Sequence, residues 1–260
     1  MNKFNNRGDR GNPSYMFDAM ILAGGENNWR LTRCAEQPYE ALIDIAGKPM
    51  VAFVAEALAA SSYVRRIFIV GPAKELARYS FPASTVVVQG GKTIMETIKI
   101  GFEAIGSKKH VLVATADIPL LTPDAVDDFV LKCVPVTADF YYPIVEREIN
   151  DRFYPGNKRT YVRLKEGTFT GGNLFLVNPA IVPRCCGMAE KIIANRKNPL
   201  KLCYLLGWKF IFKFIFGNLH LHEVESRVTE LLGISGTVVK SGFPEVGIDV
   251  DKPSDLELVR

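Results

Sequence analysis

The chain has 260 residues, of which 48% are apolar, and a formal net charge of +4. This length suits one large α/β domain with a substantial core. The mild charge suits an anionic small substrate or an anionic membrane surface and argues against a dedicated nucleic-acid groove. The five cysteines form no Cys-x-x-Cys pair, and no segment near the N-terminus is apolar enough for a signal peptide. We therefore expect reduced thiols and a cytoplasmic protein.

The first 17 residues are rich in Asn, Gly, Arg and Asp, and we expect a disordered tail there. Short apolar runs then alternate with helical patterns. Strands are predicted at 19–23, 66–70, 85–88 and 110–114, and helices at 49–60, 73–78, 93–105 and 123–133. This alternation predicts a Rossmann-like α/β fold, a mostly parallel sheet with helices on both faces. The loops that follow its strands should share one rim, where ligands bind.

The pattern changes after about residue 138. Further strands are predicted at 139–144, 160–164, 173–177, 237–240 and 246–250, with a turn at 165–168 and a final helix from Pro253. Residues 179–232 have a helical pattern that is interrupted near Asn198-Pro199 and Gly217-Asn218. We expect a single domain over 18–260, with a helical elaboration at about 180–235.

A glycine turn ends the first predicted strand, in Ala19-Met-Ile-Leu-Ala-Gly-Gly25, and Arg30 lies in the polar loop that follows. Glycines let the backbone approach a ligand and expose its N–H groups to phosphate oxygens. Arg30 can add a charge-assisted hydrogen bond to the same phosphates. Downstream, the segment Glu40-Ala-Leu-Ile-Asp-Ile-Ala-Gly-Lys-Pro-Met50 carries a Gly-Lys-Pro turn.

These motifs resemble the nucleotide signature of the MobA-like NTP transferases, which include the molybdenum-cofactor guanylyltransferases, the sugar-1-phosphate nucleotidylyltransferases and the cytidylyltransferase of isoprenoid synthesis. The resemblance implies the nucleotide-diphospho-sugar transferase fold. It also implies transfer of an NMP from an NTP to a phosphorylated or hydroxyl acceptor, with release of pyrophosphate. On this reading Arg30 neutralises phosphate charge, and the nucleotide is held by Leu22, Ala23, Gly24 and Gly25.

The chain departs from that signature in two places. The loop before Arg30 is about a residue longer, and Glu40 stands at the usual lysine position. Lys48 or a basic residue from 158–165 could supply the missing positive charge. A carboxylate beside phosphates should repel them, so the competing hypothesis is a nucleotide-binding protein that has lost transfer activity.

Asp117 follows the strand at 110–114, within Ala114-Thr-Ala-Asp-Ile-Pro-Leu120. A carboxylate just past a buried parallel strand lies at the ligand rim, and Mg²⁺ takes carboxylate, water and phosphate oxygens. In the resembled family an aspartate in this context holds that ion. The resemblance thus makes Asp117 a catalytic metal ligand and places Thr115 at the nucleotide, while the alternative is an aspartate that only caps the next turn.

A second Mg²⁺ ligand is expected from Asp249-Val-Asp251, just before the helix at Pro253. Alternation along a strand would place Asp249 and Asp251 on the same side. One could then bind the metal while the other caps the helix. We favour Asp249 as the metal ligand.

The turn Gln89-Gly-Gly-Lys92 lies where the resembled enzymes read the base, which implies base contacts by Gln89 and Gly90. A tight turn without ligand contact would satisfy the same glycines. Nothing in the sequence selects among guanine, cytosine, adenine and uracil.

An acceptor site is implied by Thr170-Gly-Gly-Asn-Leu-Phe175, which resembles the family's acceptor-side turn and assigns Gly171, Gly172 and Asn173 to the second substrate. The basic residues before it could hold an acceptor phosphate or form a solvated face. They are Lys158, Arg159, Arg163 and Lys165, and Arg159 is our candidate.

Residues 200–216 are apolar nearly all round, with Lys201, Lys209 and Lys213 interspersed. The charges and Gly207 argue against a membrane-spanning helix. We expect burial against the sheet or in a homodimer. The alternative is a lid over an apolar acceptor, or an interfacial helix that meets anionic lipid and a lipid-linked acceptor.

His220 and His222 form a His-x-His pair, which is a fragment of many zinc sites. No third ligand lies nearby in the sequence, so we expect a surface position.

Overall fold

The computed structural model describes residues 15–27, 31–32, 34–195, 198, 201, 204 and 207–260. The first strand begins at Phe17, the last residue of the predicted tail. Residues 1–14 of that tail and the predicted phosphate ligand Arg30 lie outside the described residues.

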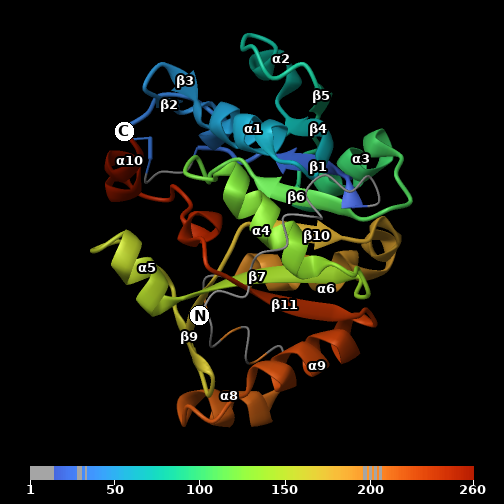
Figure 1. The fold of residues 1–260 in the computed structure, drawn as a ribbon, viewed down its shortest axis with the longest axis vertical. Helices are drawn as coiled ribbons and strands as arrows, with labels where there is room; N and C mark the ends of the chain where they lie inside the picture. The colour runs from blue at the N-terminus through green and yellow to red at the C-terminus, as the bar shows by residue number, and fades with distance from the viewer. Residues whose placement is uncertain are drawn as a thin grey trace.

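One sheet organises the described chain, in the strand order β5-β4-β1-β6-β10-β7-β9-β8, with β11 also paired to β7 (Figure 1). Its parallel half consists of β1 (Phe17–Leu22), β4 (Val64–Gly71), β5 (Thr85–Gln89) and β6 (Val111–Thr115). The other strands are β7 (Phe140–Glu146), β8 (Val162–Leu164), β9 (Gly167–Gly171), β10 (Leu174–Val177) and β11 (Gly236–Ser241). Here β10 runs antiparallel to β6 and β7, and β11 runs parallel to β7.

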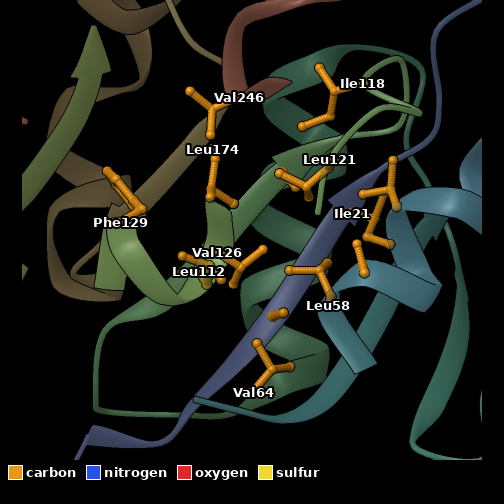
Figure 2. Packing of buried hydrophobic residues seen from close by; sticks show 14 of the residues in the cluster. Ile21, Leu58, Val64, Leu112, Ile118, Leu121, Val126, Phe129, Leu174 and Val246 are labelled. Atoms are coloured by element: carbon orange, nitrogen blue, oxygen red, sulfur yellow. The ribbon is translucent and has the colours of Figure 1, made fainter. Parts of the chain in front are cut away.

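Helices cover both faces of this sheet, which confirms the predicted α/β fold class. One face carries α1 (Met50–Ala60) and α4 (Pro123–Cys133), and the other carries α3 (Ile94–Ile105) and α6 (Val182–Asn195). Successive β1 residues alternate between the two layers. Ile21 lies beside Leu58 (Figure 2) in the buried cluster that also contains Phe129, whereas Met20 belongs to the cluster that contains Phe102. Complete burial of a side chain such as Ile21 contributes about 1.5–3 kcal/mol to folding.

The remaining elements are shorter or lie at the edges of the sheet. They are β2 (Asp44–Ile45), β3 (Lys48–Pro49), α2 (Ala73–Leu76), α5 (Arg147–Phe153), α8 (Trp208–Ile215), α9 (Leu221–Leu232), α10 (Pro253–Val259) and the 3₁₀ turns η2 (Glu40–Leu42), η3 (Pro179–Ile181) and η4 (Pro244–Gly247). The β2–β3 hairpin, η2 and α5 were not predicted from the sequence.

Two threonine caps explain where the central helices begin. The Thr93 hydroxyl accepts a hydrogen bond from the Glu96 backbone N–H (3.2 Å), and the Glu96 carboxylate accepts one from the Thr93 N–H (3.3 Å). Thr122, directly before α4, accepts from the Ala125 N–H at 3.2 Å. Such caps satisfy N–H groups that have no partner within the helix, so the starts of α3 and α4 are fixed locally.

The structure corrects a predicted strand and a predicted turn. The segment 246–250 is not a strand, because its backbone makes isolated hydrogen bonds to two different loops. The Val246 carbonyl accepts from the Asn173 N–H, and the Val250 N–H donates to the Asp117 carbonyl. A strand would need a ladder of such bonds to one neighbour. The turn predicted at 165–168 is also shorter, since β9 already begins at Gly167.

The apolar segment 200–216 is more exposed than we expected. Four large side chains in it are mainly exposed, namely Tyr204 (76%), Phe212 (56%), Ile215 (62%) and Phe216 (72%). The expected burial against the sheet is therefore wrong for these four, and covering by a second copy or by a lipid surface stays a prediction. Within the described part of the chain, no helix combines the length and apolarity that crossing a bilayer requires.

A buried aspartate on β1 forms ion pairs with two arginines on β4. The Asp18 side chain is 1% exposed and accepts hydrogen bonds from Arg66 (3.0 and 2.7 Å) and Arg65 (3.1 and 2.9 Å). Burial alone would raise the pKa of Asp18, but the hydrogen bonds and charges of both arginines outweigh it and hold this pKa below its ordinary value.

We expect Asp18→Asn to lower the free energy of unfolding by about 2 kcal/mol, because hydrogen bonds to a charged group are lost. Half-exposed guanidinium groups keep this loss below that of a fully buried pair. Since the folded-state pKa is lowered, the contribution is present above the ordinary pKa and disappears as the pH falls through the folded-state value. Urea unfolding at pH 7 and in acid measures both effects. Asp151→Asn, at an exposed ion pair with Arg147, should change stability little, and an equal loss in this control would contradict the assignment.

Candidate functional site

A cavity of about 220 Å³ opens at the carboxyl ends of β1 and β6, beside the N-terminus of α3. It is lined by Leu22, Ala23, Gly24, Gly25, Glu40, Ala41, Gly91, Lys92, Thr93, Ile94, Thr97, Thr115, Ala116 and Asp117. The glycine turn and Asp117, which are far apart in the sequence, therefore share one cavity. The reason is that β1 and β6 are parallel neighbours, so their following loops meet at one rim.

Backbone hydrogen bonds hold these two loops together. The Ala23 N–H donates to the Val70 carbonyl (2.9 Å), and the Ala116 N–H donates to the Leu22 carbonyl (3.2 Å). A Cβ on Gly24 would lie 3.5 Å from the Thr97 hydroxyl, which is also part of the lining. A larger side chain at Gly24 would thus extend into space that the cavity now offers to a ligand.

The start of α3 contributes positive charge to the cavity. Gly91, Lys92 and Thr93 all line it, and Lys92 is exposed. A helix N-terminus carries about half a positive elementary charge, so it favours an anionic ligand. Lys92 was not predicted from the sequence as a source of positive charge in the site. Its position directly after two glycines and directly before the capping threonine could have indicated that role.

Gln89 and Gly90, the predicted base contacts, are not among the lining residues. The Gln89 amide oxygen accepts from the Ala73 N–H at 3.1 Å, and the amide nitrogen donates to the Gly90 carbonyl at 3.1 Å. The Gln89 side chain therefore stabilises the beginning of α2. Its hydrogen bonds and its place outside the lining do not support a contact with a base, which stays a prediction.

Glu40 does line the cavity. Its backbone N–H donates to the Gly25 carbonyl (3.0 Å), and its carboxylate would lie 3.4 Å from a Cβ placed on Gly25. The Lys48 ammonium instead pairs with Glu56 at 2.7 Å and is outside the lining, so it does not supply charge to the cavity.

Three carboxylates meet at the Asp117 end of the cavity. Oxygen atoms of Asp117, Asp249 and Asp251 lie within 4.8 Å of one another, and the first two residues are buried. The Thr115 hydroxyl donates to Asp117, and the Val250 N–H donates to the Asp117 carbonyl at 2.9 Å. This all-oxygen cluster has the ligand chemistry of a Mg²⁺ site.

The predicted capping of the last helix by Asp249 or Asp251 is wrong. Asp255, within the first turn of α10, caps it instead, because its carboxylate accepts from the N–H groups of Asp251 (3.1 Å) and Lys252 (3.2 Å). The metal role favoured for Asp249 stays a prediction. The side chains of Asp249 and Asp251 are both directed to the cluster with Asp117.

Arg159 contacts this carboxylate cluster. Its guanidinium forms an ion pair with the Asp249 carboxylate and donates to the Asp249 carbonyl at 3.0 Å. Burial lowers the pKa of Arg159, and the charges of Asp255, Asp251 and Asp117 oppose that shift. Arg159 thus offsets part of the negative charge of the cluster.

The glycines of the predicted acceptor turn have a packing role. A Cβ on Gly171 would collide with the Tyr142 hydroxyl, and one on Gly172 would lie 2.9 Å from Pro143 Cγ. Asn173 joins the turn to its neighbours, since its N–H donates to Val246 (2.7 Å) and its carbonyl accepts from Thr115 (3.1 Å). Through these contacts Gly171, Gly172 and Asn173 keep the segment that contains Asp249 close to β6. A contact of the three residues with an acceptor stays a prediction.

Comparison with known proteins places this geometry in a family. The family model described as the MobA-like NTP transferase domain matches residues 19–198. A solved structure from Thermus thermophilus, described as a hypothetical transferase, is 39% identical over 93% of this chain and 99% of that chain, with a TM-score of 0.76. A search of curated proteins finds no significant match.

Two more distant structures share the fold. One is the CMP:2-keto-3-deoxy-manno-octonic acid synthetase complexed with CTP, at 12% identity over 94% of this chain and 96% of that chain, with a TM-score of 0.58. The other is the 2-C-methyl-D-erythritol 4-phosphate cytidylyltransferase of Thermus thermophilus, at 12% identity over 94% and 97%, with a TM-score of 0.52. At such identities the likeness extends to the fold alone.

Proposed function

This chain belongs to the MobA-like NTP transferase family, and we propose that it transfers an NMP group from an NTP to a small phosphorylated or hydroxyl-bearing acceptor. The acceptor oxygen attacks the α-phosphorus, a bond forms between them, and the bond from the α-phosphorus to the bridging oxygen breaks to release pyrophosphate. The observation that carries the proposal is one cavity that joins a glycine turn, a helix N-terminus and a lysine to a buried carboxylate cluster.

In this proposal, different cavity residues contact the nucleotide and neutralise its phosphate charge. Ala23, Gly24 and Gly25 lie against the nucleotide, and the N-terminus of α3 with Lys92 offsets the negative charge of its phosphates. Charge neutralisation and positioning supply most of the catalysis in phosphoryl and nucleotidyl transfer. Arg30, which the family signature assigns to the phosphates, lies outside the described residues.

We propose Asp117 and Asp249 as Mg²⁺ ligands, with Asp251 as a third carboxylate within reach. The residues fit the ion because the cluster offers only oxygen ligands and carries more negative charge than Arg159 alone balances. When bound, Mg²⁺ would add positive charge beside the reacting phosphate. Arg159 would then be free to hold a phosphate or carboxylate of the acceptor, the role predicted for it from the sequence.

A pyrophosphate-release screen tests this function. Each of the four NTPs is combined with a panel of phosphorylated sugars, polyols and hydroxyl acceptors in the presence of Mg²⁺. We expect release with one preferred NTP and one acceptor class. NTP binding without pyrophosphate release for any pair would instead favour a nucleotide-binding protein, the second candidate that the Glu40 carboxylate in the cavity supports.

Glu40→Lys is expected to strengthen NTP binding by about tenfold, because a positive charge replaces a negative one at the edge of the glycine turn. Calorimetric titration with each NTP measures the change. Glu56→Lys makes the same substitution at an exposed residue outside the lining and controls for the altered net charge. A clear loss of NTP affinity in Glu40→Lys would show that the carboxylate makes a needed contact.

A further inference from the structure

Two histidines and a glutamate come together beside the β8–β9 edge of the sheet, away from the cavity strands β1 and β6. Glu166 lies in the turn between β8 and β9, His220 precedes α9, and His222 lies in the first turn of that helix. Their possible ligand atoms lie within 4.8 Å of one another. The His-x-His pair was predicted to be at the surface, which the structure confirms, and the fold adds a third ligand from 54 residues earlier in the chain.

The backbone around these three residues is firmly held. One Glu166 oxygen accepts from the Leu221 N–H (3.0 Å), and the other lies 3.0 Å from His220 Nδ1. Beneath them, the buried Leu219 packs with Leu164 and Phe169, so α9 and the β8–β9 hairpin share a small apolar cluster. The ligands therefore come from elements that are already fixed relative to each other.

The charge of this cluster suits a cation. The Glu166 carboxylate supplies negative charge to the cluster beside the two imidazoles. The Lys213 ammonium, which lies beside the first turn of α9, is paired with Glu223. The side chains of His220 and Glu166 are 42% and 32% exposed, which leaves a route for an ion from solvent.

We propose that Glu166, His220 and His222 bind a divalent transition-metal ion, with Zn²⁺ as the preferred one. Two imidazole nitrogens and a carboxylate oxygen form a ligand set that Zn²⁺ favours, and a water completes the tetrahedron. Glu166 and His220 Nδ1 share a hydrogen bond at 3.0 Å, whose proton the ion would displace on binding. The ion would join the turn of the edge hairpin to the start of α9.

This site differs in chemistry from the carboxylate cluster at Asp117, which offers oxygen alone and suits Mg²⁺. It shares no residue with the cavity. The proposal therefore stands or fails independently of nucleotide transfer.

Zinc titration of the full-length, chelator-treated protein tests the site by calorimetry, with excess Mg²⁺ present to occupy the carboxylate cluster. We expect one equivalent of Zn²⁺ to bind, and His222→Ala and Glu166→Gln each to weaken it at least about tenfold. His222 is exposed, and Gln retains the shape of Glu166, so both variants should fold. His110→Gln removes the remaining histidine and should bind as the wild type does.

Cobalt spectra and thermal unfolding provide two further readouts. Bound Co²⁺ should show tetrahedral ligand-field bands without the thiolate charge-transfer band of cysteine ligation, and Zn²⁺ should raise the Tm of the wild type but not of His222→Ala. No zinc binding to the wild type, equal binding by His222→Ala and wild type, or a thiolate band would each overturn the proposal.

Discussion

Asp117→Asn is expected to lower the rate of Mg²⁺-dependent pyrophosphate release by at least about 100-fold. The substitution removes one charge from the three-carboxylate cluster and replaces an oxygen ligand by an amide nitrogen that cannot bind Mg²⁺. Because Asn has nearly the same shape, the Thr115 contact and the packing around the loop should persist. The measurement is initial rate against Mg²⁺ concentration for wild type and variant.

A matched control separates this effect from a general loss of charge. Asp124→Asn makes the same change at an exposed residue in the first turn of α4, outside the cavity lining. It should keep wild-type turnover and nearly wild-type stability. If Asp117→Asn also retained wild-type rates, Asp117 would not be a metal ligand, and the proposed site would be wrong at its centre.

Gly24→Val should reduce NTP affinity by at least about 100-fold while the protein stays folded. A Cβ at Gly24 would be in ordinary contact with Thr97, at 3.5 Å, so the folded chain accepts it. The branched methyl groups beyond that atom would fill the space where we place the phosphates, and they would keep the ligand from the backbone N–H groups. Calorimetry with the preferred NTP measures the affinity, and circular dichroism monitors the fold.

Gly242→Val provides the control, because Gly242 is exposed and a Cβ there has no neighbour within 4 Å. Unchanged NTP binding by Gly24→Val would place the nucleotide elsewhere. Loss of binding in both variants would point to a general effect of valine substitution rather than to the cavity.

Much of the parallel half of the fold followed from local sequence. The buried run that becomes β1 and the glycine turn at Gly24 each depend on a few neighbouring residues, so both could be predicted from a short window of sequence. Adjacent parallel strands then bring Asp117 to the glycine turn by topology alone.

Contacts between distant segments decided what the sequence pattern missed. Asp249 and Asp251 reach Asp117 from an irregular segment that single hydrogen bonds to Asn173 and Asp117 hold in place, and no periodicity predicts such bonds. The amide oxygen of Gln89 accepts a hydrogen bond from the Ala73 N–H at the start of α2, which no local pattern indicates, and its contact with a base stays a prediction.

The sequence by itself determined the α/β layers, the glycine turn and the family, because strand and helix periodicity and turn chemistry are properties of neighbouring residues. Only the tertiary structure decided that Arg159 faces Asp249, that Lys92 and Glu40 line the cavity, and that Glu166 joins His220. Each of these depends on which loops a folded sheet brings to the same edge. Side-chain charge and hydrogen-bonding capacity are encoded locally, but the partner of each group is set by packing across the whole domain.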